Sequence, residues 1–275
     1  MAAEQSGPGH HGQDKPSGLD PSVPHIARIQ NYWRGGKDNY AADREAAGHI
    51  AAAYPDLAHS VRANREFLAR SVRYLAGDAG IRQFLDIGTG LPAAGSVHEV
   101  AQAVAPQCRV VYADNDPVVL VHARALLTSG PHGATAYVDA DVRDTGQVLG
   151  QAAATLDFAQ PVAVIVVSVL HMIDDHDDPH SIVARLMDPM PPGSFLAITH
   201  VASDLEPEAM AEMTRRMSQH VAQRATPRDR ATVTRLFAGL QLVPPGLVRV
   251  PEWRPESAEA AAAPSTQWGG VARKP

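Results

Sequence analysis

Apolar and polar positions follow two patterns along the chain, one typical of buried strands and one typical of helices. Five short apolar runs stand at residues 84–87, 110–113, 136–138, 162–167 and 195–199. Longer stretches with a helical period of apolar positions separate these runs. Near-continuous apolar strands with helices between them are typical of a parallel sheet that is covered on both faces. The pattern therefore predicts a doubly wound α/β fold.

Three of the helices have a recognisable start, in which a capping residue is followed by proline. These starts are Asp116-Pro117, Asp178-Pro179 and Thr226-Pro227. A capping side chain accepts a hydrogen bond from the first turn, and proline suits the first helical position because it has no N–H to leave unpaired. We expect the corresponding helices over 116–127, 182–187 and 233–238.

The two ends of the chain differ from its alternating middle. Residues 1–23 have little to bury, so we expect a disordered tail. Residues 24–78 are expected to form an N-terminal helical segment, with helices over 28–54 and 61–75 and breaks near Asn39 and Pro55. The core, 79–275, ends in apolar runs at 240–243, 247–250 and 268–272 without a long helix between them, which predicts an antiparallel edge, and residues 256–264 indicate a loop.

Composition and charge narrow the classes of function. The chain has 275 residues and a formal net charge of −6, and it lacks a block of Lys and Arg, so a nucleic acid is not an expected partner. The longest apolar run, 162–170, is too short to cross a bilayer, and the N-terminus lacks the order of a signal peptide. Cys108 is the single cysteine, so no internal disulfide can form. We expect a cytoplasmic protein that does not bind membranes.

The first strand leads into a glycine turn, FLDIGTGLP at 84–92. Ligands of doubly wound sheets bind beyond the carboxyl ends of the strands, where glycine permits positive φ and close approach of the backbone. Gly88, Gly90 and Ala93 have the spacing of a dinucleotide fingerprint, and Asp114 ends the second strand. An NAD-type oxidoreductase is therefore one interpretation.

Two residues of the turn argue against a dinucleotide. The carboxylate of Asp86 would repel a diphosphate, and Pro92 stands where the phosphate-facing helix would begin. A ligand that carries positive charge would instead be attracted to Asp86. S-adenosylmethionine is such a ligand, since it has an ammonium and a sulfonium group, and its ribose hydroxyls could donate to Asp114.

The end of the third strand adds further acidic residues, in the stretch YVDADVRD at 137–144. Asp139, Asp141 and Asp144 follow this strand, and each could equally be a helix cap or part of a solvated turn. A carboxylate that accepts from the adenine amino group, with Val142 against the ring, is the chemistry that the cofactor needs here. Acidic residues at successive strand ends favour the cofactor.

The sequence resembles class I S-adenosylmethionine-dependent methyltransferases, and within them an actinobacterial family long catalogued as a domain of unknown function. The resemblance covers nearly all of the chain after residue 24. It rests on GGKDNYAADREAA (35–47), NREFL (64–68), GIRQFLDIGTGLP (80–92), VHEVAQ (97–102), VVYADNDPVVL (110–120), DADVRD (139–144), VLHMIDDHDDP (169–179), PPGSFLAITH (191–200) and PPGLVRVPEWRPE (244–256). It implies a Rossmann-like, mostly parallel sheet of seven strands with an antiparallel last strand.

The resemblance also implies which residues bind the cofactor. We expect Asp86, Gly88, Thr89 and Gly90 to hold the methionine end, Asp114 with Asn115 to bind the ribose side, and Asp141 with Val142 to bind the adenine. Ser168 and His171 follow the fourth strand and are expected to line the floor where methyl group and acceptor meet. His171 is a candidate general base, although a core histidine would fit the pattern as well.

Residues 35–40, GGKDNY, are either an ordinary helix break or part of an N-terminal helical lid. As a lid, the segment would bring Lys37 and Asn39 to the cofactor carboxylate or the acceptor. The run 171–180 contains carboxylates and histidines, but a solvated loop that ends in the Asp178 cap fits it better than a metal site, so we expect no metal.

The sequence limits the class of methyl acceptor without identifying the molecule. Cys108 precedes the second strand, away from the strand ends, and the fourth strand ends in Ser-Val-Leu-His rather than in a loop that grips a base amine. Together with the acidic charge, this favours a small-molecule acceptor. A protein that binds S-adenosylmethionine without turnover stays open, as does the choice between a monomer and a homodimer.

Overall fold

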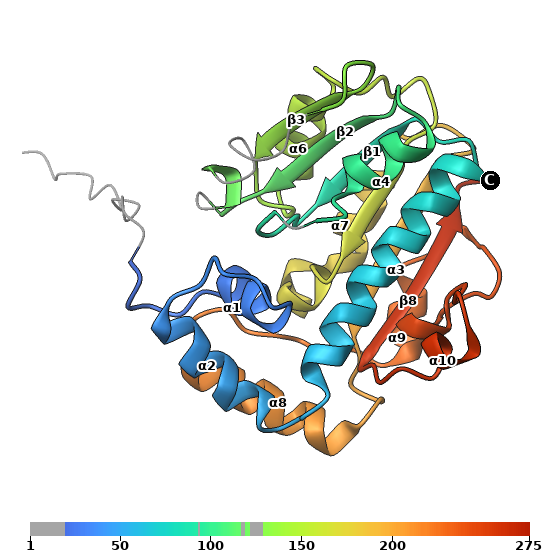
Figure 1. Ribbon diagram of the computed structural model, residues 1–275. Coiled ribbons are helices and arrows are strands. Elements are labelled where there is room, and N and C mark those ends of the chain that lie inside the picture. The colour runs from blue at the N-terminus through green and yellow to red at the C-terminus, as the bar shows by residue number, and fades with distance from the viewer. Residues whose placement is uncertain (1–19, 93, 117–118, 122–128) are drawn as a thin grey trace, which may run out of the picture.

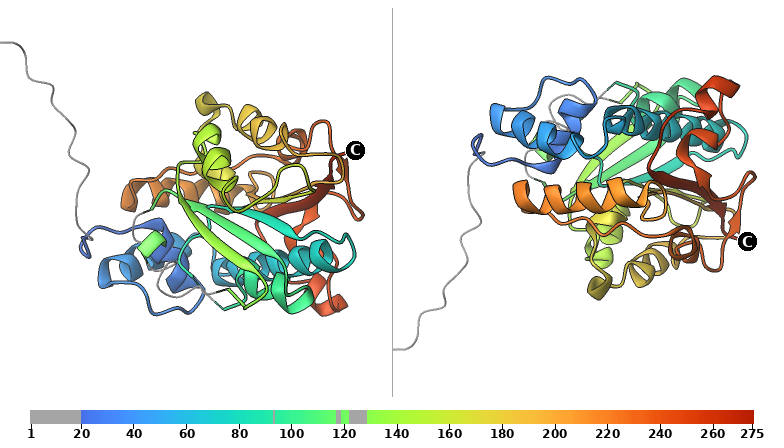
Figure 2. Two further views of the ribbon diagram at one scale, coloured as in Figure 1. Left: turned by 90° about the horizontal axis from the view of Figure 1, so that it is seen from above. Right: turned by 90° about the horizontal axis from the view of Figure 1, so that it is seen from below.

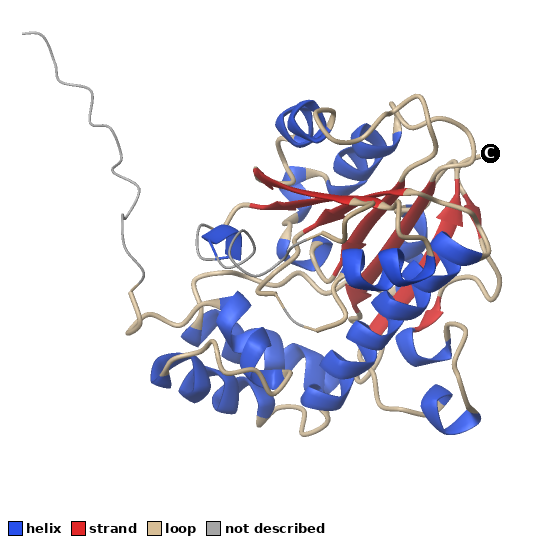
Figure 3. Ribbon diagram, turned by 45° about the horizontal axis from the view of Figure 1, so that its top comes forward, coloured by secondary structure: helices blue, strands red, loops and turns tan. Residues whose placement is uncertain are grey.

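A mixed sheet runs through the centre of the molecule (Figures 1 and 3). The computed structural model describes residues 20–92, 94–116, 119–121 and 129–275. Within these residues the sheet has eight strands in the order β3-β2-β1-β4-β5-β8-β6, with β7 paired to β8. The strands are β1 Gln83–Ile87, β2 Arg109–Asp114, β3 Ala134–Asp139, β4 Ala163–Val167, β5 Phe195–Val201, β6 Gln241–Leu242, β7 Val248–Arg249 and β8 Gln267–Arg273.

The five parallel strands confirm the pattern of apolar runs, and the α/β class is confirmed with them. β3, β2, β1, β4 and β5 pair in parallel, and β8 pairs antiparallel with β5. The sheet has one strand more than the seven that the family resemblance implies. Two short strands, β6 and β7, both pair with β8 and lie on either side of the turn at Pro244-Pro245-Gly246. β8 lies inside the sheet rather than at its edge.

Helices cover both faces of the sheet and bury one apolar cluster on each. One face is covered by α3 (Leu57–Gly77) and α4 (Val97–Val104), and the other by α6 (Thr145–Ala152), α7 (Pro179–Met187) and α9 (Arg230–Arg235). α3 turns one side to the sheet through Phe67, Leu68, Val72 and Leu75, which recur at helical spacing. The doubly wound arrangement that was expected for the core is therefore present.

A third apolar cluster joins the N-terminal helices to a helix far along the chain. α1 (Ile26–Trp33) and α2 (Ala41–Ala51) pack with α8 (Pro207–His220), and Figures 1 and 2 show α8 beside α2. The sequence pattern predicted α1 and α2, but α8 was missed. Its signal is present in Met210, Met213 and Met217, which lie on one side of the helix and are buried in this cluster. Charged neighbours hide that pattern.

Several element boundaries differ from the expectations. The cap of α9 is Asp229, which accepts from the Thr232 N–H, and not Thr226. Residues 256–264 are not entirely loop, because Ser257 caps the short helix α10 (Ala258–Ala261). Short 3₁₀ helices, η1 (Leu170–Met172), η2 (Asp175–Asp177) and η3 (Val250–Glu252), complete the described elements.

Some expectations fall wholly or partly beyond the described residues. The tail was predicted over 1–23, of which 1–19 lie outside the described residues. Of the helix predicted over 116–127, residues 119–121 are described and helical, Asp116 is described before the helix, and 117–118 and 122–127 lie outside the described residues. The division of the chain at residue 78 stays an interpretation of the sequence, since α3 precedes it and packs on the sheet. No helix in the described ranges is long and apolar enough to cross a membrane.

Candidate active site

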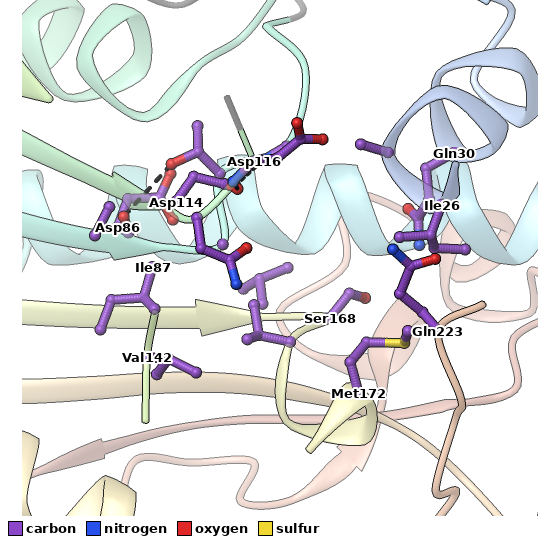
Figure 4. Close-up of a pocket in the computed structure, with 18 of the residues that line it drawn as sticks. Ile26, Gln30, Asp86, Ile87, Asp114, Asp116, Val142, Ser168, Met172 and Gln223 are labelled. Atoms are coloured by element: carbon purple, nitrogen blue, oxygen red, sulfur yellow. Dashed lines mark hydrogen bonds between the residues drawn. The ribbon is translucent and has the colours of Figure 1, made fainter. Parts of the chain in front are cut away.

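A cavity of about 330 Å³ lies beyond the carboxyl ends of β1, β2, β3 and β4 and is bordered by α1 and α3 (Figure 4). It occupies the position that a doubly wound sheet offers to a ligand. Nine of the residues singled out in the sequence line it: Asp86, Gly88, Thr89, Gly90, Asp114, Asn115, Asp141, Val142 and Ser168. The fold thus brings together residues from four separate segments of the chain. Their contacts with a cofactor stay a prediction.

The glycine turn after β1 has a conformation that requires glycine at two positions. Gly88 has φ +69° and Gly90 has φ +63°, both in the left-handed region. A Cβ atom on Gly88 would collide with the side chain of Val169, whereas a Cβ atom on Gly90 would meet nothing within 4 Å. The Gly88 N–H donates to the Ala113 carbonyl at 2.8 Å, which fixes the turn against β2.

Asp114 at the end of β2 organises the neighbouring backbone. One carboxylate oxygen accepts from the Gly90 N–H at 3.0 Å, and the other accepts from the Asp116 N–H at 3.0 Å. Burial raises the pKa of Asp114, and these two hydrogen bonds oppose that rise. Asp114 therefore holds the glycine turn in place as well as facing the cavity.

The adenine side of the predicted site carries a carboxylate that is already paired. Asp141 accepts from the Arg143 Nη2 at 2.6 Å and from the Asn115 Nδ2 at 2.8 Å. The hydrogen bond from Arg143 is the main reason that the pKa of Asp141 is lowered. Its other oxygen accepts from the Arg143 N–H and Nε, both at 2.9 Å, so Asp141 is ionised and its two oxygens are engaged by four donors. The nearby Asp144 is a helix cap, because it accepts from the Gln147 N–H at 2.9 Å.

Asp86 is a buried carboxyl group at the end of β1. Its residue is 6% exposed, and burial raises its pKa to about 7. The positive charge of Arg65 on α3 opposes this rise, and the negative charge of Asp114 adds to it. A carboxylate held out of water in this way favours a ligand that brings positive charge.

Ser168 follows β4 and has the left-handed backbone conformation, φ 58°, which is uncommon for a residue other than glycine. Its hydroxyl accepts from the Asn64 Nδ2 at 2.8 Å and donates to the Gln267 Oε1 at 3.0 Å. Its N–H donates to the Thr199 Oγ1 at 3.0 Å. These three bonds, from three different elements, hold the strained backbone at the cavity floor.

His171, the candidate general base, is buried in the interior. Its residue is 5% exposed, and it is not among the residues that line the cavity. Burial lowers its pKa to about 3, with the Arg228 and His200 side chains adding to the effect, so the ring is neutral. It packs edge-on against His200 in the interior. The structure therefore favours the core-histidine interpretation over the catalytic one.

The segment 35–40 does not bring its polar side chains to the cavity either. Lys37 is exposed and does not line the cavity. Asn39 points back to its own segment, because its Nδ2 donates to the Asn31 Oδ1 at 3.0 Å and to the Gly36 carbonyl at 2.9 Å. Asn31 also accepts from the Asp38 N–H. The glycine-rich segment is thus a bonded turn, and α1 supplies the residues that border the cavity.

Several lining residues were not predicted. They are His25, Gln30 and Arg34 of α1 and its cap, Asn64 and Arg65 of α3, and Gln223 after α8. Gln30 and Arg34 stand one helical turn apart, which is the spacing of a common face, but the sequence does not say what that face meets. His25 lies 3.2 Å from Asp116, so it links α1 to the end of β2.

The region 174–178 is a capped turn. Asp174 and Asp178 accept from backbone N–H groups two and three residues ahead, and Asp178 caps α7 as expected. Among the described residues, no three His, Cys, Asp or Glu side chains are grouped so as to hold a metal ion.

Comparison with known proteins assigns the chain to a family. The family model described as S-adenosyl methyltransferase matches residues 12–275. A solved structure of a DUF574 family protein from Streptomyces avermitilis MA-4680 is 43% identical, with a TM-score of 0.90, and the match covers 93% of this chain and 99% of that one. A putative methyltransferase from Thermobifida fusca YX is 38% identical, with a TM-score of 0.85, over 96% and 99% of the two chains.

More distant likeness supports the fold alone. Human N-acetylserotonin methyltransferase in complex with S-adenosylmethionine is 15% identical, with a TM-score of 0.51, over 90% of this chain and 70% of that one. A search of curated proteins gave no match. The family leaves the NAD-type oxidoreductase and the binder without turnover unsupported. The chain belongs to the S-adenosyl methyltransferase family and is an S-adenosylmethionine-dependent methyltransferase.

Proposed function

We propose that this cavity is the methyl-transfer site and that the acceptor is a small molecule. One observation carries the proposal: nine residues that were predicted from the sequence to bind the cofactor line one cavity at the carboxyl ends of the parallel strands. The cofactor supplies an activated methyl group on sulfur. The protein then has to bind, align and shield the reactants from water.

The nucleoside end of the cofactor fits the ends of β2 and β3. Asp114 has two oxygens turned to backbone N–H groups, and its remaining lone pairs can accept from ribose hydroxyls. Asp141 accepts from the adenine amino group in exchange for its hydrogen bond from Asn115, and the buried Val142 lies beside it for contact with the ring. Gly88 and Gly90 allow the backbone of the turn to approach the ligand closely.

The amino-acid end fits a pair of opposite charges. Asp86 is the carboxylate for the ammonium group. Arg34 lines the cavity and lies next to Arg65, whose positive charge adds to burial in lowering the pKa of Arg34 to about 10. Among the described residues, no carboxylate lies within 4.0 Å of the Arg34 guanidinium, whose Nε donates to the Gln30 carbonyl. Arg34, with Arg65 beside it, is the cation for the cofactor carboxylate, in place of Lys37.

S-adenosylhomocysteine should bind with a dissociation constant in the micromolar range, and NAD should not bind. Pairing with the ammonium requires ionised Asp86, whose pKa is about 7 without ligand. Affinity should therefore rise with pH up to about 7, by up to about tenfold per pH unit, and then level off. Titration calorimetry at several pH values measures this. Asp86→Asn should remove the pH dependence, and binding of NAD alone would contradict the proposal.

Arg34→Met should weaken binding of S-adenosylmethionine about tenfold or more, because a charge-assisted hydrogen bond of about 1.5–3 kcal/mol is lost. Decarboxylated S-adenosylmethionine has no carboxylate, so its affinity should be equal for the two proteins. Lys37→Met is the matched control, since it removes an exposed cation of the same region. An equal loss for both ligands, or a larger loss in Lys37→Met, would show that Arg34 does not bind the carboxylate.

The single cysteine and the net charge bear on the compartment of the reaction and on the class of acceptor. We place it in the cytoplasm, supported by Cys108, a buried free thiol that suits a reducing compartment. The acidic net charge supports an acceptor other than a nucleic acid. A homodimer stays a proposal, and size-exclusion chromatography with light scattering measures it.

A further inference from the structure

The cavity has a second end that the cofactor residues do not account for. In Figure 4, Ile26, Gln30, Met172 and Gln223 lie together on the side away from Asp86, Asp114 and Val142, with Ser168 between the two groups. The labelled side chains of this second end are apolar or carry an uncharged amide. An uncharged, partly apolar molecule suits such a wall.

Two amide side chains that line the cavity have an oxygen without a hydrogen-bond partner. Asn64 is 9% exposed, and its Nδ2 is used by Ser168, while its Oδ1 is buried without a hydrogen-bond partner. Gln223 has its Nε2 3.3 Å from the His25 Nε2, and its Oε1 is also buried without a partner. Both atoms can only accept a hydrogen bond. Since buried carbonyl oxygens are normally paired, these two call for a ligand that donates.

Among the residues that the structure describes, the side chains at this end that could remove a proton are already engaged. Both ring nitrogens of His25 are engaged, because its Nδ1 lies 3.2 Å from the Asp116 carboxylate and 3.4 Å from the Ala27 N–H, and its Nε2 lies 3.3 Å from the Gln223 Nε2. The Ser168 hydroxyl donates to Gln267, and His171 does not line the cavity. An alcohol would need a base to become a nucleophile, whereas an uncharged amine nitrogen already has a lone pair.

We propose that the acceptor is an uncharged amine, whose N–H hydrogens are donated to the Asn64 Oδ1 and the Gln223 Oε1. This inference rests on the proposed function of the cavity. The two oxygens orient the nitrogen so that its lone pair faces the methyl carbon. The N–C bond forms as the S–C bond breaks, and its electron pair goes to sulfur. S-adenosylhomocysteine leaves uncharged, and the methylated nitrogen gives its extra proton to water.

The full chain is incubated with S-adenosylmethionine labelled with ¹³C in the methyl group and with the small-molecule fraction of a cell extract. The methyl carbon shift separates N-methyl from O-methyl, S-methyl and C-methyl products. We expect an N-methyl product that disappears when the extract amines are first acylated with a succinimidyl ester. An O-, S- or C-methyl product would overturn this inference alone. Absence of any labelled product would overturn the proposed function together with it.

Variants test the two oxygens separately. Gln223→Met and Asn64→Leu keep the approximate length and remove an accepting oxygen. Gln223→Met should lower kcat/KM for the N-methylation about tenfold, the effect of one hydrogen bond, while S-adenosylhomocysteine affinity stays within twofold. Asn64→Leu should lower kcat/KM at least as much, because it also removes the hydrogen bond to the Ser168 hydroxyl. Gln151→Met, on the exposed side of α6, is the matched control. An unchanged kcat/KM, or an equal loss of S-adenosylhomocysteine affinity, would overturn the role of that oxygen.

Discussion

Gly88→Ala should lower the free energy of unfolding by about 2–3 kcal/mol and weaken S-adenosylhomocysteine binding strongly. Two effects add: an alanine at φ +69° is strained, and its Cβ would occupy the space of the Val169 side chain. Either the glycine turn or Val169 has to move, and both line the cavity. Urea unfolding and titration calorimetry on the same protein measure the two effects.

Gly90→Ala separates strain from collision. Gly90 has nearly the same φ, +63°, but its Cβ would meet nothing within 4 Å. The Gly90→Ala variant should therefore lose only the part of the free energy of unfolding that comes from backbone strain, about 1–2 kcal/mol. The double variant Gly88→Ala with Val169→Ala should recover part of the Gly88→Ala loss, because the colliding methyl is removed. Equal losses in Gly88→Ala and Gly90→Ala, without recovery, would rule out the collision.

The parallel strands and the glycine turn could be predicted because their signals are local. A buried parallel strand is apolar over successive residues, and the turn that follows β1 needs glycine whatever its surroundings. The contact of Gly88 with Val169 could not be predicted, since it joins segments 81 positions apart in sequence and depends on β4 lying beside β1. α8 was missed because its buried face is made of methionines spaced among charged residues.

Part of the candidate site could likewise be predicted from local signals, and part of it could not. Residues at strand ends were selected correctly as neighbours, because parallel strands of one sheet end at one edge. The side formed by α1 could not be derived, since nothing in the sequence states which face of a short helix meets the cavity. Lys37 was the conspicuous cation of the glycine-rich segment, yet the Asn31 side chain binds that segment into a turn, and Arg34 is the cation on the wall. His171 follows β4 as expected, but its side chain turns into the core.

Asp114→Ala should weaken S-adenosylhomocysteine binding about ten- to a hundredfold, or about 1.5–3 kcal/mol. Asp114 is proposed to accept from the ribose hydroxyls, and it also holds the Gly90 N–H at 3.0 Å, so its removal affects both the ligand and the turn. The loss should be smaller for the 2′-deoxy analogue, which lacks one donor. Calorimetry with the two ligands shows how much of the lost binding free energy comes from the hydrogen bond to the ribose hydroxyl.

Asp139→Ala is the matched control for Asp114→Ala. Asp139 ends β3, directly opposite Asp114 in the strand register, but it is exposed and does not line the cavity. Its replacement should leave the affinity unchanged, so a loss shared by both variants would indicate a general effect of charge at this sheet edge. An unchanged affinity in folded Asp114→Ala would mean that the ribose does not bind at the end of β2. A loss in Asp114→Ala of equal size for both ligands would mean that Asp114 acts only through the glycine turn.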